Sequence, residues 1–215
     1  MKELIPNKKW LSMDDTLVIR MKCAPVDPNS LTSDDQLLMQ KMQAYIDESY
    51  ANHAKKLHIV PGIAIAANQL GVPKQIVYVH FDGDGVEHKY MLFNPKIISS
   101  SLVKTYLPHG EGCLSVATDY PGVSIRYKTV KVSAYDYFNK KDIIIDATGI
   151  LAICLQHEID HLNGLVYYDR IAEIPPNATP YELPKPKKEV ATNQKTTEAT
   201  STEPKSNKTK KSNNK

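Results

Sequence analysis

Residues 148–164 read Thr-Gly-Ile-Leu-Ala-Ile-Cys-Leu-Gln-His-Glu-Ile-Asp-His-Leu-Asn-Gly, and this stretch decides how the rest of the chain is interpreted. It predicts a helix that begins near Thr148 and carries Ile150 to Leu162, with Gly164 suited to the left-handed residue that often follows a helix. The apolar run before the histidines indicates that the helix is substantially buried. Buried histidines beside acids need polar partners, so a functional site is expected here.

His157 and His161 stand four residues apart, so their rings project from one face of the helix. Two imidazoles in this arrangement can bind one metal ion, and Glu158 lies where it can reach a water molecule on that ion. A catalytic site of this kind has three protein ligands and one open position. The metalloprotease pattern with a third, later histidine fails, because Tyr167 occupies that position.

The better candidate for the third ligand is Cys113, in the segment Glu111-Gly112-Cys113-Leu114-Ser115. A thiolate is a strong ligand for zinc or ferrous iron. A lone cysteine is usually a small core residue, but the histidine helix makes ligation the favoured interpretation.

A third segment, residues 62–71, is rich in glycine and alanine and contains Gln69. Such small residues let backbones and ligands approach closely. Gln69 is expected to point from this wall into a cleft. The alternative interpretation is a tightly packed strand and turn.

The remaining pattern predicts an α+β domain. A capping box at Ser33–Gln36 and apolar residues at helical spacing predict an amphipathic helix over residues 34–53. Alternating apolar residues predict strands at residues 75–80, 89–93, 97–107, 129–137 and 142–146, with a turn at 81–85. Strands grouped between two helices favour mostly antiparallel sheets packed around the C-terminal metal-binding helix.

Charge is unevenly distributed along the 215 residues. From Pro175 to Lys215 there are nine Lys and four Glu, so this part carries a net charge of +5. Because the whole chain carries +3, the remainder carries −2. This Lys/Thr/Asn-rich segment has too few apolar residues to bury the surface that would offset its loss of conformational entropy on ordering. We therefore predict a catalytic domain over 1–174 and a disordered tail over 175–215. The tail is either solubilising or a transient ribosome contact.

Composition also limits the setting of the protein. Three cysteines, an odd number, do not indicate a disulfide framework. No apolar run approaches the ~20 residues that span a bilayer, and the N-terminus lacks the apolar core of a signal peptide. A cytoplasmic location, without membrane or specific DNA binding, is expected.

The three segments resemble the three signature motifs of the peptide deformylase family, in the same order. The family patterns Glu-Gly-Cys-Leu-Ser and Gln-His-Glu-x-Asp-His are matched completely by Glu111–Ser115 and Gln156–His161. The pattern Gly-x-Gly-x-Ala-Ala-x-Gln is matched except that Ala64 replaces the second glycine. The resemblance covers roughly residues 10–172, and the long segment before the first motif resembles the type 2 bacterial members.

The resemblance implies a metallohydrolase that removes the formyl group from the N-terminal formyl-methionine of nascent polypeptides. It implies one divalent ion, ferrous iron in most members, with zinc, nickel or cobalt able to replace it. The implied ligands are Cys113, His157 and His161. Hydroxide on the ion would attack the formyl carbon, with Glu158 as general base and acid.

The resemblance also implies the groups that meet the substrate. The oxyanion would be bound by the Gln69 side chain and the Leu114 backbone N–H. An apolar pocket would take the methionine, and the implied lining is Ile63, Ile150, Ile153 and Cys154. The peptide would be held as an added strand, with Gly62, Ile63, Ala64, Gly110 and Glu111 as the implied binding positions.

Two further expectations concern single residues. The methyl group of Ala64 is expected to narrow the cleft or to alter the local backbone, because alanine disfavours positive φ. Arg126 matches an arginine of the family, and an ion pair between Arg126 and Asp160 is expected to support the helix.

Two other functions remain open at this point. A metalloendopeptidase would use the same helix motif, but with His or Glu as third ligand, and it would cleave unformylated peptides. A non-catalytic metal-binding module would close its site with a fourth protein ligand. The complete cysteine motif and Glu158 favour the deformylase interpretation over both.

Overall fold

The computed structural model describes residues 4–83 and 85–182. The chain divides into a unit over residues 1–184 and a second over 185–215. The second unit lies wholly outside the described residues, and so does most of the predicted tail. Within the described part, no helix has the length and apolar character needed to cross a membrane.

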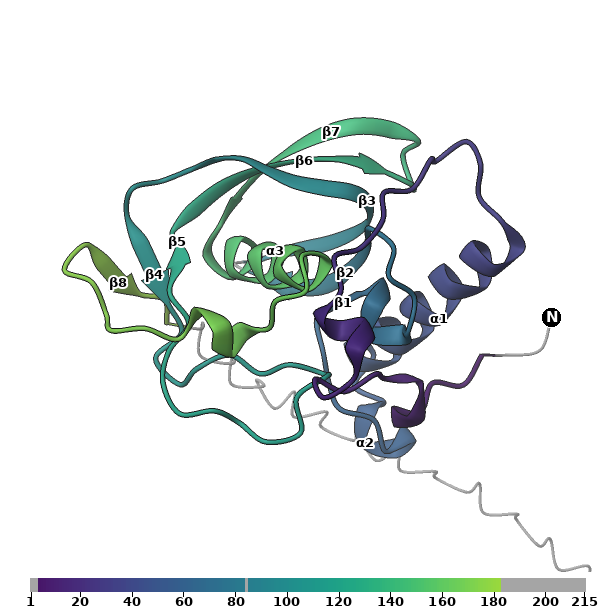
Figure 1. The fold of residues 1–215 in the computed structure, drawn as a ribbon, viewed down its shortest axis with the longest axis horizontal. Helices are drawn as coiled ribbons and strands as arrows, with labels where there is room; N and C mark the ends of the chain where they lie inside the picture. Colours follow the sequence, from purple (N-terminus) through teal and green to yellow (C-terminus); the bar gives the residue numbers. More distant parts are fainter. Residues whose placement is uncertain (1–3, 84, 183–215) are drawn as a thin grey trace, which may run out of the picture. The chain divides into compact units, whose positions relative to one another are not determined.

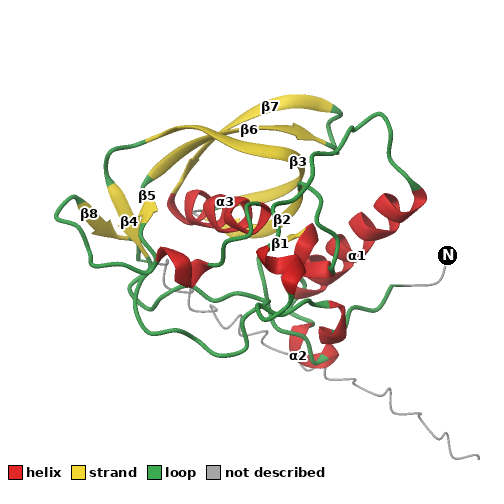
Figure 2. Ribbon diagram, viewed as in Figure 1, coloured by secondary structure: helices red, strands yellow, loops and turns green. Residues whose placement is uncertain are grey.

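The described part is an α+β domain (Figures 1 and 2). Its α-helices are α1 (Ser33–Tyr50), α2 (Ala54–Leu57) and α3 (Gly149–Leu162), and its 3-10 helices are η1 (Lys8–Trp10), η2 (Leu17–Arg20), η3 (Ala67–Leu70) and η4 (Tyr167–Arg170). Its strands are β1 (Ala64–Ala66), β2 (Ile76–Gly83), β3 (Val86–Ser100), β4 (Lys104–Tyr106), β5 (Arg126–Tyr127), β6 (Thr129–Asp136), β7 (Lys141–Thr148) and β8 (Ala178–Pro180).

The main sheet is antiparallel throughout, in the order β1-β2-β3-β6-β7. It has a helix on each face, because successive side chains of a strand point to opposite sides. In β2, Val77 and Val79 belong to the core cluster that contains the buried side of α3. Ile76 and Tyr78 belong to the cluster that contains the buried side of α1. Burial on both faces explains why β2 reads as an almost continuous apolar run.

Helix α1 begins one residue earlier than the sequence indicated, and its cap is different. Thr32, not Ser33, is the N-cap residue, and its side-chain oxygen accepts from the backbone N–H of Asp35. The Asp35 carboxylate in turn accepts from the Thr32 backbone N–H at 3.1 Å. Asp35 completes this capping box in place of Gln36 because it is the third residue after the N-cap Thr32, and its buried carboxylate also pairs with the Lys74 ammonium.

Two strand predictions were wrong at their ends. The turn predicted at 81–85 is shorter, because Phe81 is buried in the core and pairs with His88 as β2 continues to Gly83. The single strand predicted over 97–107 is two strands, β3 and β4, which belong to different sheets. The chain leaves the first sheet at Ser101–Val103, where Leu102 is 89% exposed.

The described structure continues past the predicted domain boundary at residue 174. Strand β8, residues 178–180, pairs in parallel with β4 and completes a three-stranded sheet in the order β5-β4-β8. The backbone partners supplied by β4 order this polar segment, which carries no apolar signal of its own. The remainder of the predicted tail, residues 183–215, lies outside the described residues.

Candidate active site

Helix α3 lies in the middle of the domain (Figure 1) and supplies His157, His161 and Glu158. Thr148 is its N-cap residue, and every residue from Leu151 to Leu162 is buried. The first half of the helix, Ile150 to Leu155, is apolar on all sides, and the helix contacts both sheets, so its polar second half is buried with it. The helix therefore carries His157 and His161 into the interior, where a polar side chain needs a defined partner.

The side chains of Cys113, His157 and His161 meet at one point. Each offers a ligand atom, and these atoms all lie within 4.8 Å of one another. The sulfur of Cys113 is 3.2 Å from Nε2 of His161. Within the described residues this is the one group of three or more His, Cys, Asp or Glu side chains with that property. A sulfur and two ring nitrogens form a donor set suited to zinc or ferrous iron, and three ligands leave one position open.

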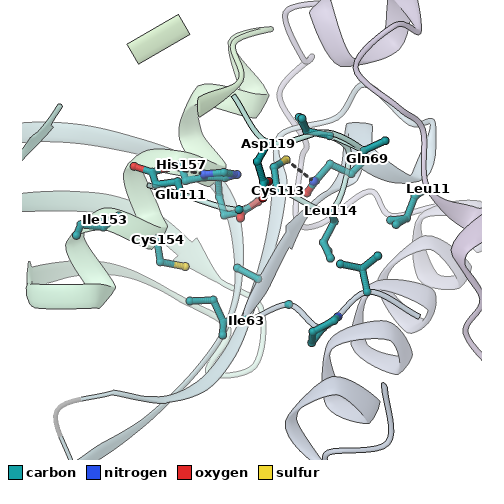
Figure 3. A pocket seen from close by; sticks show the side chains of 18 of the residues that line it. Leu11, Ile63, Gln69, Glu111, Cys113, Leu114, Asp119, Ile153, Cys154 and His157 are labelled. Carbon is teal, nitrogen blue, oxygen red and sulfur yellow. Dashed lines mark hydrogen bonds and ion pairs between the residues drawn. The ribbon is translucent and has the colours of Figure 1, made fainter. Parts of the chain in front are cut away.

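Gln69 connects the first motif to the second. Its Oε1 accepts from the backbone N–H of Ala66 at 2.8 Å, which fixes the amide orientation. Its Nε2 then points at Ser115 Oγ (3.2 Å) and at the sulfur of Cys113 (3.7 Å). The dashed line in Figure 3 marks the contact with Cys113. The donor end of Gln69 is thus directed at the metal-ligand group, as expected from the sequence.

Glu158 is buried beside the ligands and has a carboxylate oxygen, Oε2, without a hydrogen-bond partner among the described residues. Burial is the largest cause of the raised pKa of Glu158, which is about 7, and the Glu111 charge acts in the same direction. A carboxylate with a free oxygen in a pocket and a pKa near neutrality is suited to accept and donate protons.

Glu111 orients the ring of His157 through a contact with one of its two nitrogens. Its Oε2 lies 2.8 Å from Nδ1 of His157, so Nε2 is left for the metal. Both oxygens also accept from Arg126, at 2.7 and 2.9 Å. Burial would raise the pKa of Glu111, but the hydrogen bonds from Arg126 and His157 outweigh it and bring the pKa to about 2. The carboxylate therefore stays ionised and the His157 ring stays oriented.

The expected contact between Arg126 and Asp160 is present, with Arg126 Nη1 donating to Asp160 at 2.5 Å. Asp160 also accepts two hydrogen bonds from Arg170, at 2.6 and 3.0 Å. The sequence reading did not foresee the contacts of Arg170 or the binding of Arg126 to Glu111. A buried arginine has five N–H donors and needs more than one carboxylate oxygen. Glu111, the acid of the second motif, could have been predicted from the sequence as the second partner of Arg126.

A pocket of about 680 Å³ opens onto the ligand group. Its walls are mostly apolar and include nearly all positions predicted to bind substrate, as Figure 3 shows for several of them: Gly62, Ile63, Ala64, Glu111, Ile150, Ile153 and Cys154. Gly110, which was also predicted to bind substrate, is not among its lining residues. Its φ of +80° is a conformation that favours glycine. Leu11 and Met13 line the pocket as well, and no motif indicated them.

Two small residues shape the wall of the pocket. Ala64 lies in β1 opposite Val79, and it is not among the described residues with positive φ, so its methyl group causes no backbone strain. Its side chain is 5% exposed and packs in the core beside α3. A Cβ atom on Gly62 would lie 3.0 Å from Leu114 Cδ2, so a larger residue here would require the buried Leu114 side chain to shift.

Comparison with known proteins identifies this arrangement. Residues 8–177 match the family model described as polypeptide deformylase. The chain belongs to the polypeptide deformylase family. It is 47% identical over 175 residues to a peptide deformylase of Mycoplasma pneumoniae, which covers 81% of this chain and 80% of that relative. It is 39% identical to peptide deformylase 2 of Bacillus cereus, over 79% of this chain and 95% of the relative.

Solved deformylase structures have the same fold. A peptide deformylase from Synechococcus elongatus in complex with actinonin has a TM-score of 0.61 at 28% identity, covering 75% of this chain and 78% of that one. A Met-Ala-Ser-bound deformylase from Acinetobacter baumannii has a TM-score of 0.61 at 25% identity, covering 80% and 100%. The expectations of an α+β deformylase fold and of a metal-dependent hydrolase are confirmed.

Proposed function

We propose that this deformylase removes the formyl group from formyl-methionyl nascent peptides at the pocket above α3, with the residue roles given below. One observation carries the proposal. Ligand atoms of Cys113, His157 and His161 lie within 4.8 Å of one another, beside a buried Glu158 oxygen that has no partner among the described residues. The pocket of about 680 Å³ gives a peptide access to this group.

The three ligands fit a divalent ion, and we propose ferrous iron. The Glu111 carboxylate presents Nε2 of His157 to the ligand group, and Cys113 is a soft ligand of the kind that iron and zinc bind. The bound ion supplies Lewis acidity, which makes water a nucleophile near neutral pH. Metal analysis of protein purified without oxygen tests the choice of iron, and stoichiometric zinc in protein from an iron-replete host would contradict it.

Glu158 moves the proton. Its free oxygen takes a proton from the attacking water as the new C–O bond forms on the formyl carbon. It then returns that proton to the nitrogen of methionine as the C–N bond breaks. The products are formate and a peptide with a free amino group. A pKa raised to about 7 by burial suits both steps, because neither protonation state is strongly favoured near neutral pH.

Gln69 and Leu114 stabilise the oxyanion that forms between these steps. Gln69 Nε2 is held 3.7 Å from the Cys113 sulfur by a fixed amide, so its donor is already oriented. The backbone N–H of Leu114, next to Cys113 in the chain, is the second donor. Loss of one such donor costs ~100–1000-fold in rate.

The substrate is recognised by its methionine and its backbone. Ile153 and Cys154, 2% and 5% exposed, form the apolar part of the pocket next to Glu158. This environment suits the flexible thioether of methionine. Strand β1 is the edge strand of the main sheet, so the peptide backbone can pair with it as an added strand.

The decisive experiment measures formate release from a formyl-Met dipeptide by iron-loaded protein under anaerobic conditions. Glu158→Gln should lower kcat by at least ~100-fold while metal content stays at one per chain. Glu173→Gln, a change at an exposed acid outside the pocket, should leave the rate unchanged. Equal rates for wild type and Glu158→Gln would overturn the role of Glu158. Cleavage of unformylated peptides would favour an endopeptidase.

We further propose that the enzyme acts in the cytoplasm and that its basic C-terminal tail contacts ribosomes. The proposal rests on charge, since the region from Pro175 onward contains nine Lys and four Glu. Co-sedimentation of the full chain with ribosomes should fall steeply as salt rises. Equal sedimentation of a chain ending at residue 182 would contradict a role for the tail.

A further inference from the structure

Asn68 lies next to Gln69 in η3 and is fully buried at 0% exposure. The first motif pattern leaves this position free, and none of the roles proposed above uses it. Its side chain reaches across to the end of α3, where Nδ2 donates to the backbone carbonyl of His161 at 2.7 Å. The same Nδ2 lies 3.5 Å from the carbonyl of Ile19. Asn68 therefore joins η2, η3 and the metal helix at one point.

The orientation of this amide is fixed by its surroundings. Both neighbours of Nδ2 are carbonyl oxygens, which accept and cannot donate. A reversed amide would place Oδ1 against those two oxygens. Nδ2 therefore faces the carbonyls, and Oδ1 must point elsewhere in a fully buried site.

Two buried polar atoms in this region lack a hydrogen-bond partner among the described residues. Among the described residues, neither Oδ1 of Asn68 nor Nδ1 of His161 has a hydrogen-bond partner. Nε2 of His161 faces the Cys113 sulfur at 3.2 Å, so the proton of a neutral ligand ring belongs on Nδ1. Asn68 thus has an acceptor without a donor, and His161 has a donor without an acceptor. A metal-ligating histidine almost always donates its other N–H to an oxygen acceptor.

The other ligands already have such support. Glu111 accepts from Nδ1 of His157, and Gln69 Nε2 and the Ser115 backbone N–H, at 3.4 Å, reach the sulfur of Cys113. Among the described residues, Nδ1 of His161 has no such partner, and the Asn68 side chain donates to the backbone carbonyl of the same residue.

We propose that Asn68 is the positioning residue of His161. Its Nδ2 holds the backbone of the ligand, and its Oδ1 accepts the Nδ1 proton through a bridging buried water molecule, because the two atoms are not hydrogen-bonded directly. Asn68 and Gln69, adjacent in sequence, then serve two different ligands, His161 and Cys113. The inference rests on the proposed role of His161 as a metal ligand.

The test measures metal binding by the apoprotein, apart from catalysis. Co²⁺ affinity is determined by chelator competition, and the absorption bands of the Co²⁺ form report the geometry of its thiolate and imidazole ligands. Asn68→Ala should weaken Co²⁺ binding about 10–100-fold and shift those bands. In the iron-loaded enzyme, kcat should fall while the KM for a formyl-Met dipeptide changes less than twofold.

Asn163 provides a matched control on the same helix. Its Nδ2 also donates to a carbonyl of α3, that of Ile159 at 2.8 Å, but the side chain lies at the exposed end of the helix. Asn163→Ala should leave Co²⁺ affinity and spectrum unchanged. If both variants lower the apoprotein Tm equally and only Asn68→Ala weakens Co²⁺ binding, the proposal stands. Co²⁺ affinity and spectrum within twofold of wild type for Asn68→Ala would overturn it.

A measurement on wild-type protein covers the case in which Asn68→Ala does not fold. In Zn²⁺-loaded protein, ¹⁵N NMR of the histidine rings should show His161 protonated at Nδ1 with a slowly exchanging proton. Protonation at Nε2, or exchange as fast as in an exposed histidine, would overturn the proposal. His161→Ala separates the two levels of inference, because unchanged Co²⁺ affinity in that variant would contradict the proposed ligand set itself.

Discussion

Glu111 Oε2 lies 2.8 Å from Nδ1 of His157, and the same carboxylate accepts two hydrogen bonds from Arg126. One buried acid therefore orients the His157 ring and neutralises a buried cation. Substitutions can separate the two effects, because the proposed metal site depends on the first and the stability of the fold on the second.

Glu111→Ala should be strongly destabilising, by roughly 3–5 kcal/mol, because it leaves the buried guanidinium of Arg126 with Asp160 alone. Urea unfolding of the apoprotein measures this. Glu111→Gln keeps an acceptor for His157 and should cost less stability. Its metal affinity should stay closer to wild type than that of Glu111→Ala. Equal loss of metal affinity in the two variants would contradict the orienting role.

Ala64→Gly tests the departure from the family pattern. Removing a buried methyl group and adding glycine to β1 should lower the free energy of unfolding by about 1–2 kcal/mol. The same change widens the pocket that Ala64 lines, so bulky inhibitors should bind more tightly. Calorimetry and inhibitor titration check the two effects. A stability gain would show that the methyl group is strained after all.

Gly164 should not tolerate a side chain. Its φ is +75°, and a Cβ atom would come within 2.4 Å of the Arg20 carbonyl oxygen. Gly85 has a similar φ of +83° with nothing within 4 Å of the position of a Cβ atom. Gly85→Ala therefore measures the backbone cost alone, about 1 kcal/mol. Gly164→Ala should cost at least ~2 kcal/mol more in urea unfolding, and equal costs would mean that Arg20 moves away freely.

Asp35 should make stability depend on pH in the acid range. Burial acts to raise its pKa, but the hydrogen bonds from Lys74 and Thr32 outweigh it and lower the pKa. A lowered pKa means that the stabilisation is present above the unfolded value of about 4 and is lost as pH falls through the folded value.

Asp35→Asn should therefore be less stable than wild type at pH 7 by about 1–2 kcal/mol. The difference should narrow below about pH 4. Asp34, in the same first turn of α1 but exposed, is the matched control. Asp34→Asn should change stability by less than ~0.5 kcal/mol at either pH. A gap that stays constant from pH 7 to pH 3 would contradict the electrostatic explanation.

Local patterns in the sequence were sufficient for the class of fold and for the clustering of Cys113, His157 and His161. The spacing of His157 and His161 is converted into shared direction by the helix alone, and the apolar run before them requires burial. The three motifs then indicated Cys113 and Gln69 as partners, and the structure brings Cys113 to the histidines and Gln69 to Cys113. These features depend on residues near one another in the chain or on motifs with a fixed pattern.

Tertiary structure decided what depends on distant partners. Strand β8 forms because β4 offers it a backbone edge, and the Asp35 carboxylate in the α1 cap finds an ion-pair partner in the distant Lys74. Glu111 became the support of His157, and Asn68 the neighbour of His161, through contacts that cross 46 and 93 residues of sequence. A sequence read alone shows which side chains need partners, and only packing decides which partners they receive.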